Sequence, residues 1–163
     1  MFQNKVAVIT GGARGIGKTI AEEFRKNGAV VCIIDQIPND YFTGDIAEES
    51  VLFAFQQKVI ADYGHIDFLI NNAMLSKGGI NNCSFDDFNY ALRVGVSAPY
   101  MLAKLFRSHF AAGGCIVNIS SSQLKFALFK PTSFGEETRA IADELMQKNM
   151  VVVNLETTEK DVA

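Results

Sequence analysis

A glycine-rich stretch near the N-terminus is the first part of the sequence that could do chemistry. It reads TGGARGIGKT over residues 10–19 and places Gly11, Gly15 and Gly17 between a β-rich run and a segment of helical period. Glycine permits the tight turn and the close backbone approach that a pyrophosphate requires. The following helix start presents free N–H groups at the positive end of its dipole. The stretch therefore predicts an anion-binding turn.

An acidic residue stands at the distance that a dinucleotide site needs. Asp35 ends the next apolar run, twenty residues after Gly15, where a carboxylate can accept hydrogen bonds from both hydroxyls of an adenosine ribose. Its charge would repel a ribose 2′-phosphate, so it favours NAD over NADP. Arg14 favours the opposite choice, because a guanidinium beside the loop could pair with that phosphate.

Apolar runs of strand length alternate with longer segments of helical period, and these elements must position the polar residues. Strands are expected at residues 6–10, 30–35, 67–72, 115–120 and 151–155. Their near-continuous β-branched character indicates strands covered on both faces, which predicts an α/β fold with a parallel sheet. A short strand at 41–44 is a weaker prediction, because the link from Asp35 is too short for the usual helical crossover.

Three helices are expected between these strands. The first spans 15–27, and the second carries the apolar stripe Val51, Phe55 and Val59 and ends near Gly64. The third spans about 86–110. It contains Pro99, which predicts a kink, since an interior proline costs on the order of 3 kcal/mol in a straight helix.

Length, composition and charge limit the possible classes. The 163 residues are 48% hydrophobic and 20% charged, which suits one globular domain over 1–163. A net charge of -3 without a Lys/Arg cluster argues against a nucleic-acid partner. No apolar run reaches membrane-spanning length, and the N-terminus lacks a signal-peptide pattern. A cytoplasmic protein is therefore expected.

The cysteines and histidines predict no metal site. Cys32, Cys83 and Cys115 form no CxxC pair, and their odd number suits a reducing compartment. Cys32 and Cys115 lie in apolar runs and are expected to be buried. His65 and His109 are isolated from each other and from any cysteine or carboxylate at ligand spacing.

Taken in order, the motifs of residues 1 to about 122 resemble those of short-chain dehydrogenases/reductases. The matching pieces are TGGARGIG, Asp35, GDI at 44–46, NNA at 71–73 and IVNISS at 116–121. The resemblance implies a Rossmann-like, doubly wound parallel sheet in three layers with strand order 3-2-1-4-5-6. It also implies a nicotinamide cofactor, here NAD, and hydride transfer to or from an alcohol or carbonyl carbon. It assigns cofactor binding to Thr10, Gly11, Arg14, Gly15, Ile16, Gly17, Asp35, Asp45, Ile46, Asn72 and Ala73.

The resemblance fails where the family carries its proton-transfer groups. The family uses a Ser to polarise the substrate oxygen, a Tyr as general acid/base, a Lys that lowers the Tyr pKa, and often an Asn relay. Ser121 matches the Ser, but Phe134, Thr138 and Gly95 stand at the Tyr, Lys and Asn positions. A phenyl ring donates no proton, and general acid catalysis is typically worth about 10² to 10⁴ in rate.

Other donors remain open from the residues alone. Tyr90 and Tyr100 in the third helix, or Lys125 and Lys130 in the following loop, could supply a displaced acid. Ser121 itself could be an ordinary strand-end hydroxyl.

The segment around Phe134 also has a structural explanation. Ser133 and Glu136 form a capping box, which predicts a helix start with acidic side chains at its positive end.

The tail from about 125 to 163 resembles the start of a SepF-type cell-division protein. The resemblance is carried by KPTSF, IADEL and VVVNL in this order, and it faintly implies self-association or filament binding. A junction is expected near 122–126, with Gly113-Gly114 as a second place for one, in a recombined, engineered or naturally divergent chain.

Three functions follow as alternatives. The first is an NAD(H)-binding domain without reductase proton machinery. The second is an active NAD-dependent oxidoreductase with a relocated acid. The third is a scaffold that dimerises through the third or last helix.

Overall fold

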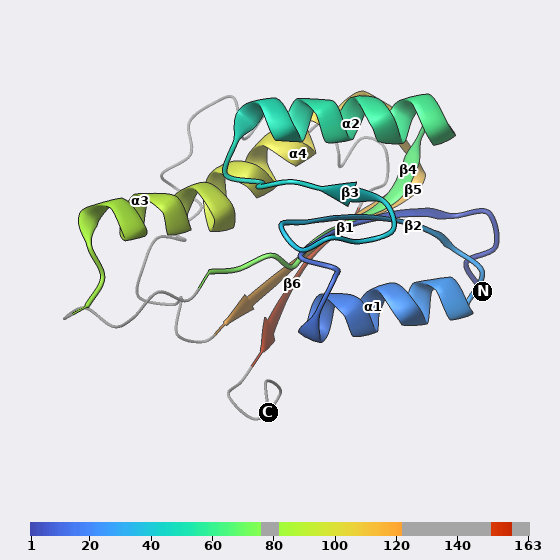
Figure 1. The fold of residues 1–163 in the computed structure, drawn as a ribbon. Helices are drawn as coiled ribbons and strands as arrows, with labels where there is room; N and C mark the ends of the chain where they lie inside the picture. The colour runs from blue at the N-terminus through green and yellow to red at the C-terminus, as the bar shows by residue number, and fades with distance from the viewer. Residues whose placement is uncertain (76–81, 122–150, 158–163) are drawn as a thin grey trace.

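The computed structural model describes residues 1–75, 82–121 and 151–157, whose strands form one parallel sheet (Figure 1). The six strands lie in the order β3-β2-β1-β4-β5-β6, and all five pairings are parallel. This confirms the predicted strand order. The strands are β1 Val6–Thr10, β2 Val30–Asp35, β3 Phe42–Thr43, β4 Ile66–Asn71, β5 Phe110–Ser121 and β6 Val151–Thr157.

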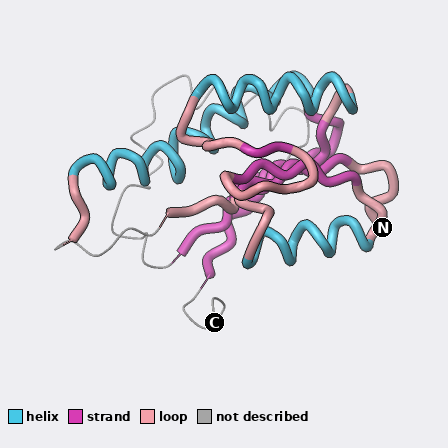
Figure 2. Tube along the Cα trace, in the orientation of Figure 1, coloured by secondary structure: helices cyan, strands magenta, loops and turns pink. Residues whose placement is uncertain are grey.

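Helices cover both faces of the sheet and confirm the predicted layers. Helix α1, Gly15–Lys26, lies on one face, and α2, Glu49–Tyr63, and α4, Ala98–Phe106, lie on the other (Figure 2). Helix α2 ends at Gly64, which adopts the left-handed conformation with φ 74°, as expected for a helix C-terminus.

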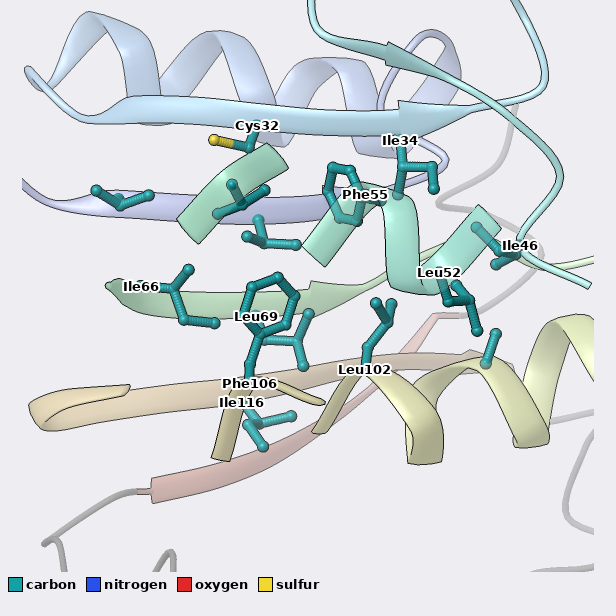
Figure 3. Close-up of a cluster of buried hydrophobic side chains, with 14 of the residues drawn as sticks. Cys32, Ile34, Ile46, Leu52, Phe55, Ile66, Leu69, Leu102, Phe106 and Ile116 are labelled. Carbon is teal, nitrogen blue, oxygen red and sulfur yellow. The ribbon is translucent and has the colours of Figure 1, made fainter. Parts of the chain in front are cut away.

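The larger core lies between the sheet and the pair α2 and α4 (Figure 3). Phe55 of α2 and Phe106 of α4 are fully buried, with ring centroids 6.4 Å apart. Leu69 of β4 lies beneath them in the same cluster. Burial of such side chains stabilises a fold by about 1.5–3 kcal/mol each.

A smaller core lies under α1. It joins Ala21 of α1 to Ile9 and Ile33 of the central strands. Phe24 at its edge stacks on Phe2, with ring centroids 5.0 Å apart, so the N-terminal segment is held against α1. The glycine loop thus connects a strand and a helix that are each fixed by packing.

Strands β2 and β3 are parallel neighbours although the short link between them contains no helix. The side chain of Asn39 stabilises the turn in this link. Asn39 accepts the N–H groups of Tyr41 and Phe42 at 2.9 and 3.0 Å. It also donates to the carbonyl oxygens of Ile37 and Phe42. Four side-chain hydrogen bonds turn the chain within a few residues, so the weak prediction of a strand at 41–44 is confirmed, although β3 has two residues.

The predicted third helix is continuous, but its hydrogen-bonding pattern changes along its length. Helix α3, Phe85–Leu92, passes into a π-helical turn at Arg93–Ser97 and then into α4. Pro99 lies at the start of α4, directly after the wider turn, where its missing N–H costs little. The kink itself stays a prediction. The helix also ends earlier than predicted, because residues 107–109 form a 3₁₀ turn.

Strand β5 begins at Phe110, five residues before the predicted start at Cys115. Its pairing with β4 is irregular between Ile66 and Phe68, and Gly113 within it has φ 77°. The pairing becomes regular at Cys115, which is the predicted start of the strand. Gly113-Gly114 therefore lies inside a strand rather than in a linker, and its place as a junction stays a prediction.

Several predictions fall on residues outside the described ranges. These are the junction near 122–126, the capping box at Ser133 and Glu136, and the positions Phe134 and Thr138. The predicted strand at 151–155 is confirmed as β6, which pairs in parallel with β5.

Candidate functional site

The glycine loop joins β1 to α1 with its backbone held close to β4. Gly17 is buried, and a Cβ at this position would overlap the carbonyl oxygen of Gly11 and the side-chain amide of Asn72. Gly15 has φ 54°, and a Cβ there would point into open space. Only glycine suits both positions, so the chain turns tightly and leaves room beside Gly15.

The first turn of α1 offers hydrogen-bond donors without a side-chain cap. Arg14 occupies the N-cap position in an extended conformation, makes no capping hydrogen bond, and no acidic residue lies in the first turn. Ile16 is half-buried behind it. Backbone N–H groups at such a helix start suit an anionic group. The loop therefore fits a pyrophosphate.

Thr10 and Asn72 fasten this loop to the end of β4. The Thr10 hydroxyl accepts the N–H groups of Asn72 and Ala73, each at 3.0 Å. The Asn72 side chain donates to the carbonyl oxygens of Thr10 and Gly11, again at 3.0 Å. Thr10 is only 2% exposed. These two predicted cofactor-binding side chains therefore hydrogen-bond to the backbone that joins the loop to β4.

Asp35 lies beside the glycine loop, as its position after β2 requires. One carboxylate oxygen accepts the N–H of Ala13 at 2.9 Å, and the other accepts the N–H of Ile37 at 3.1 Å. The structure thus brings Asp35 together with the predicted loop residues. The side chain is half-exposed, so its remaining lone pairs can accept hydrogen bonds from a ligand.

Asp45 lies further along the same edge, after β3. Its carboxylate accepts the N–H of Ala47 at 2.9 Å and the hydroxyl of Tyr90 at 2.7 Å. Burial raises the pKa of Asp45, but the hydrogen bonds from Tyr90 and Ala47 outweigh it and hold the pKa below its usual value. The carboxylate is therefore charged at neutral pH. Ile46 beside it is buried in the larger core.

Gln36 and Tyr90 are two members of this site that sequence reasoning did not assign to it. The side-chain amide of Gln36 donates to the Tyr90 hydroxyl, which in turn donates to Asp45. In the chain, Tyr90 lies 54 positions after Gln36 and 45 positions after Asp45. No local pattern connects them, so only the tertiary structure reveals the cluster.

This placement argues against Tyr90 as a displaced acid. Burial and the hydrogen bond to Asp45 raise the pKa of the Tyr90 hydroxyl. Asp45 follows β3 whereas Ser121 ends β5, and these strands are four positions apart in the sheet, roughly 19 Å at about 4.8 Å per strand. Tyr90 therefore serves the β3 side of the sheet.

Two further predicted reactive positions, Ser121 and Gly95, lie in β5 and in the π-helical turn. Ser121 is the last residue of β5, where its backbone pairs with Thr157 of β6. Gly95 lies in the π-helical turn, with open space where a Cβ would stand. A Cβ would therefore fit at position 95 without a clash.

A pair of asparagines joins β4 to β5. Asn71 ends β4 and donates to the Asn118 side chain at 2.8 Å. Asn71 is 6% exposed, and its own carbonyl oxygen has no partner among the described residues. This polar pair, of which Asn71 is buried and Asn118 half-buried, was not predicted, although its register across β4 and β5 follows from the strand pairing.

The cysteines and histidines do not assemble a metal site in the described parts of the chain. Cys32 is fully buried, as predicted, whereas Cys115 is only partly buried. His65 is less isolated than predicted, because its Nε2 lies 3.4 Å from the Asp67 carboxylate. Across residues 1–75, 82–121 and 151–157, no helix has both the length and the apolar character to span a membrane.

Comparison with known proteins agrees with this geometry. The sequence profile of the family described as "short chain dehydrogenase" matches residues 5–135. An uncharacterized oxidoreductase of Thermotoga maritima is 32% identical over 139 residues, 74% of this chain and 55% of the relative. A D-threitol dehydrogenase of Mycolicibacterium smegmatis is 29% identical over 146 residues, 78% of this chain and 56% of that protein. The chain spans about half the length of the curated relatives it matches.

Solved structures show the same fold. A short-chain dehydrogenase/reductase from Serratia marcescens superposes with a TM-score of 0.79 at 23% identity, covering 95% of this chain and 74% of that one. A metagenomic short-chain oxidoreductase in complex with NADP has a TM-score of 0.76 at 24% identity, covering 95% of this chain and 81% of that one.

Proposed function

We propose, from the premise that the chain belongs to the short-chain dehydrogenase family, that it binds NAD(H) across the carboxyl ends of β1, β2 and β3. The pyrophosphate would lie on the uncapped first turn of α1, beside Gly15. The adenosine would extend past Asp35 toward Asp45. The crowding at Gly17, where even a Cβ would overlap the loop, is the observation that carries this proposal.

Asp35 supports NAD rather than NADP. Its carboxylate is fixed by the N–H groups of Ala13 and Ile37, so it cannot easily turn away from a ribose. A 2′-phosphate in this position would meet a negative charge. Arg14 is exposed and could approach a phosphate, which makes Asp35 the residue to test.

The bound nicotinamide would accept or supply a hydride, but the protein groups that normally move the accompanying proton are missing from this sequence. Phe134 and Thr138 stand at the positions of the acid and its supporting lysine, and Gly95 at that of the relay asparagine. Ser121 is the one retained member and could hold a substrate oxygen. We therefore propose cofactor binding with little or no turnover.

The decisive experiment is a titration with NADH, followed by the fluorescence of the reduced nicotinamide. We expect saturable binding, with NADH favoured over NADPH. Asp35→Ser should reduce or reverse that preference, whereas Asp40→Ser, which removes an exposed carboxylate paired with Arg25, should leave it unchanged. Absence of saturable NADH binding by the parent protein would refute the proposal.

An active oxidoreductase with a relocated acid is the second alternative. Tyr90 is a poor acid for it, since its hydroxyl is engaged by Asp45. If the parent protein is inactive because it lacks only the proton relay, the paired substitution Phe134→Tyr with Thr138→Lys should create NADH oxidation with carbonyl substrates. That result would support the first proposal over this alternative. NADH oxidation by the parent that falls on Ser121→Ala would instead favour this alternative.

A dimerising scaffold is the third alternative, and the surface of α3 favours it. Phe85 and Phe88 of this helix are 78% and 46% exposed, and none of the residues of α3 is buried. Exposed apolar side chains of this kind suit a partner surface. Light scattering should show a dimer that Phe85→Ser with Phe88→Ser dissociates; a monomer at high concentration would exclude it.

The subcellular location and the tail also remain proposals. Three free cysteines support a reducing compartment such as the cytoplasm. The resemblance of residues 125–163 to a cell-division protein supports a junction near 122–126 in a chimeric chain.

A further inference from the structure

Helix α3 is attached to the adenosine side of the sheet through one hydrogen-bonded cluster. Its Tyr90 hydroxyl donates to Asp45 at 2.7 Å and accepts from Gln36. Gln36 directly follows Asp35 in the chain. The nearby pair Arg93–Glu48 is 3.8 Å apart with both side chains more than half exposed, so it contributes little. Tyr90 therefore connects the two segments that flank the proposed adenosine site.

The cluster fixes the orientation of the Asp45 carboxylate. One oxygen accepts the N–H of Ala47 at 2.9 Å and the other accepts the Tyr90 hydroxyl. An ionised carboxylate has about four acceptor positions, so others remain for a ligand. Without the Tyr90 hydroxyl, the carboxylate would keep only Ala47 and a weaker interaction with Gln36, and its orientation would be less fixed.

A carboxylate held in this way distinguishes between purine bases. It only accepts hydrogen bonds, so opposite position 6 it attracts the 6-amino group of adenine and repels the 6-carbonyl oxygen of hypoxanthine or guanine, whose N1–H donor lies one ring position away. The discrimination depends on a fixed orientation, because a carboxylate that can turn away no longer opposes the carbonyl.

Resting on the proposed binding of NAD(H), we infer that Tyr90 is a positioning residue that makes the adenosine site selective for a 6-amino purine by holding Asp45 in place. Tyr90 acts through Asp45 and Gln36 and takes no part in hydride or proton transfer. This role differs from simple docking of α3, which would affect all dinucleotides alike.

The test compares NADH with reduced nicotinamide hypoxanthine dinucleotide, which carries the same fluorescent nicotinamide. The parent should bind NADH about tenfold more tightly, as expected for one hydrogen bond to a charged group. Tyr90→Phe should lower this ratio to about threefold or less, and Asp45→Asn should bring it close to one, since an amide can both donate and accept.

Matched variants separate positioning from folding. Tyr63→Phe removes the hydroxyl of a tyrosine that is 37% exposed at the end of α2, and it should keep the ratio of the parent. Gln36→Met alters an exposed residue and should lower the ratio in the same direction as Tyr90→Phe, by less. If circular dichroism shows that Tyr90→Phe does not fold, the affinity ratio of Gln36→Met tests the inference instead.

The outcomes distinguish the two proposals. A parent that binds neither dinucleotide refutes the proposed function and this inference with it. Binding of NADH with a ratio that Tyr90→Phe leaves unchanged overturns the inference alone. An equal loss of affinity for both dinucleotides would likewise overturn it, because that result means that Tyr90 only docks α3.

Discussion

At the scale of single residues, Asp67 shows how one buried carboxylate connects two strands. Its side chain is 4% exposed and lies 2.8 Å from the Lys5 amine and 3.4 Å from His65. It also accepts the N–H of Val6 at 2.9 Å, at the end of β1 opposite the glycine loop. A buried carboxylate persists only where such partners offset its desolvation.

Asp67→Ala is expected to destabilise the protein by about 3 kcal/mol, because hydrogen bonds to a charged group are lost and the Val6 N–H is left unpaired. Urea unfolding at neutral pH measures this. Asp40→Ala, which breaks an exposed pair with Arg25 at 2.7 Å, should change the free energy of unfolding by no more than about 1 kcal/mol. Equal effects of the two substitutions would contradict the assignment.

At the scale of elements, two glycines have space for a Cβ but differ in backbone conformation. Gly64 ends α2 with φ 74°, whereas Gly95 lies in the π-helical turn without a positive φ. A Cβ at either position meets no atom within 4 Å. Backbone conformation alone therefore decides what a side chain would cost.

Gly64→Ala should lower the free energy of unfolding by about 1–2 kcal/mol, the cost of a left-handed residue with a Cβ. Gly95→Ala should raise it by about 0.4–1 kcal/mol, because alanine restricts the unfolded chain. Thermal and urea unfolding of both variants measure the difference. A change of the same sign in both would show that the two turns do not differ as described.

At the scale of the whole molecule, helices cover both faces of the sheet. The reactivity of Cys32 in β2 measures how well they exclude solvent. Cys32 is fully buried in the larger core. Burial raises the pKa of its thiol to about 12, although a hydrogen bond with Tyr41 opposes the shift. Cys83, by contrast, is partly exposed ahead of α3.

Labelling with a disulfide reagent at pH 8 should therefore modify Cys83 quickly and Cys32 only when the protein unfolds globally, since the thiolate is the reactive form. The rate at Cys32 should rise with urea in parallel with the unfolding rate. Cys83→Ser, made in a Cys115→Ser background because Cys115 is also partly exposed, should abolish the fast phase and leave the slow one unchanged. Fast labelling of Cys32 in the native protein would show that β2 opens on its own.

Much of the fold was predictable because its signals are local. Buried parallel strands have long apolar runs, and helices show their stripe and their terminal glycine, so β1, β2, α1 and α2 lie close to the predicted ranges. The glycine loop and Asp35 were equally predictable, because the order of strand, turn and helix brings both to the same edge of the sheet.

The parts that required tertiary structure depend on contacts between distant segments. The π-helical turn before Pro99, the early start of β5 and the partnership of Tyr90 with Asp45 and Gln36 have no local signature. By itself the sequence predicted the family and the sheet, which are confirmed, and the loss of the proton donor at Phe134, which stays a prediction. Tertiary structure alone decided which polar atoms meet, because hydrogen bonds form between side chains that packing, rather than sequence spacing, brings within about 3 Å.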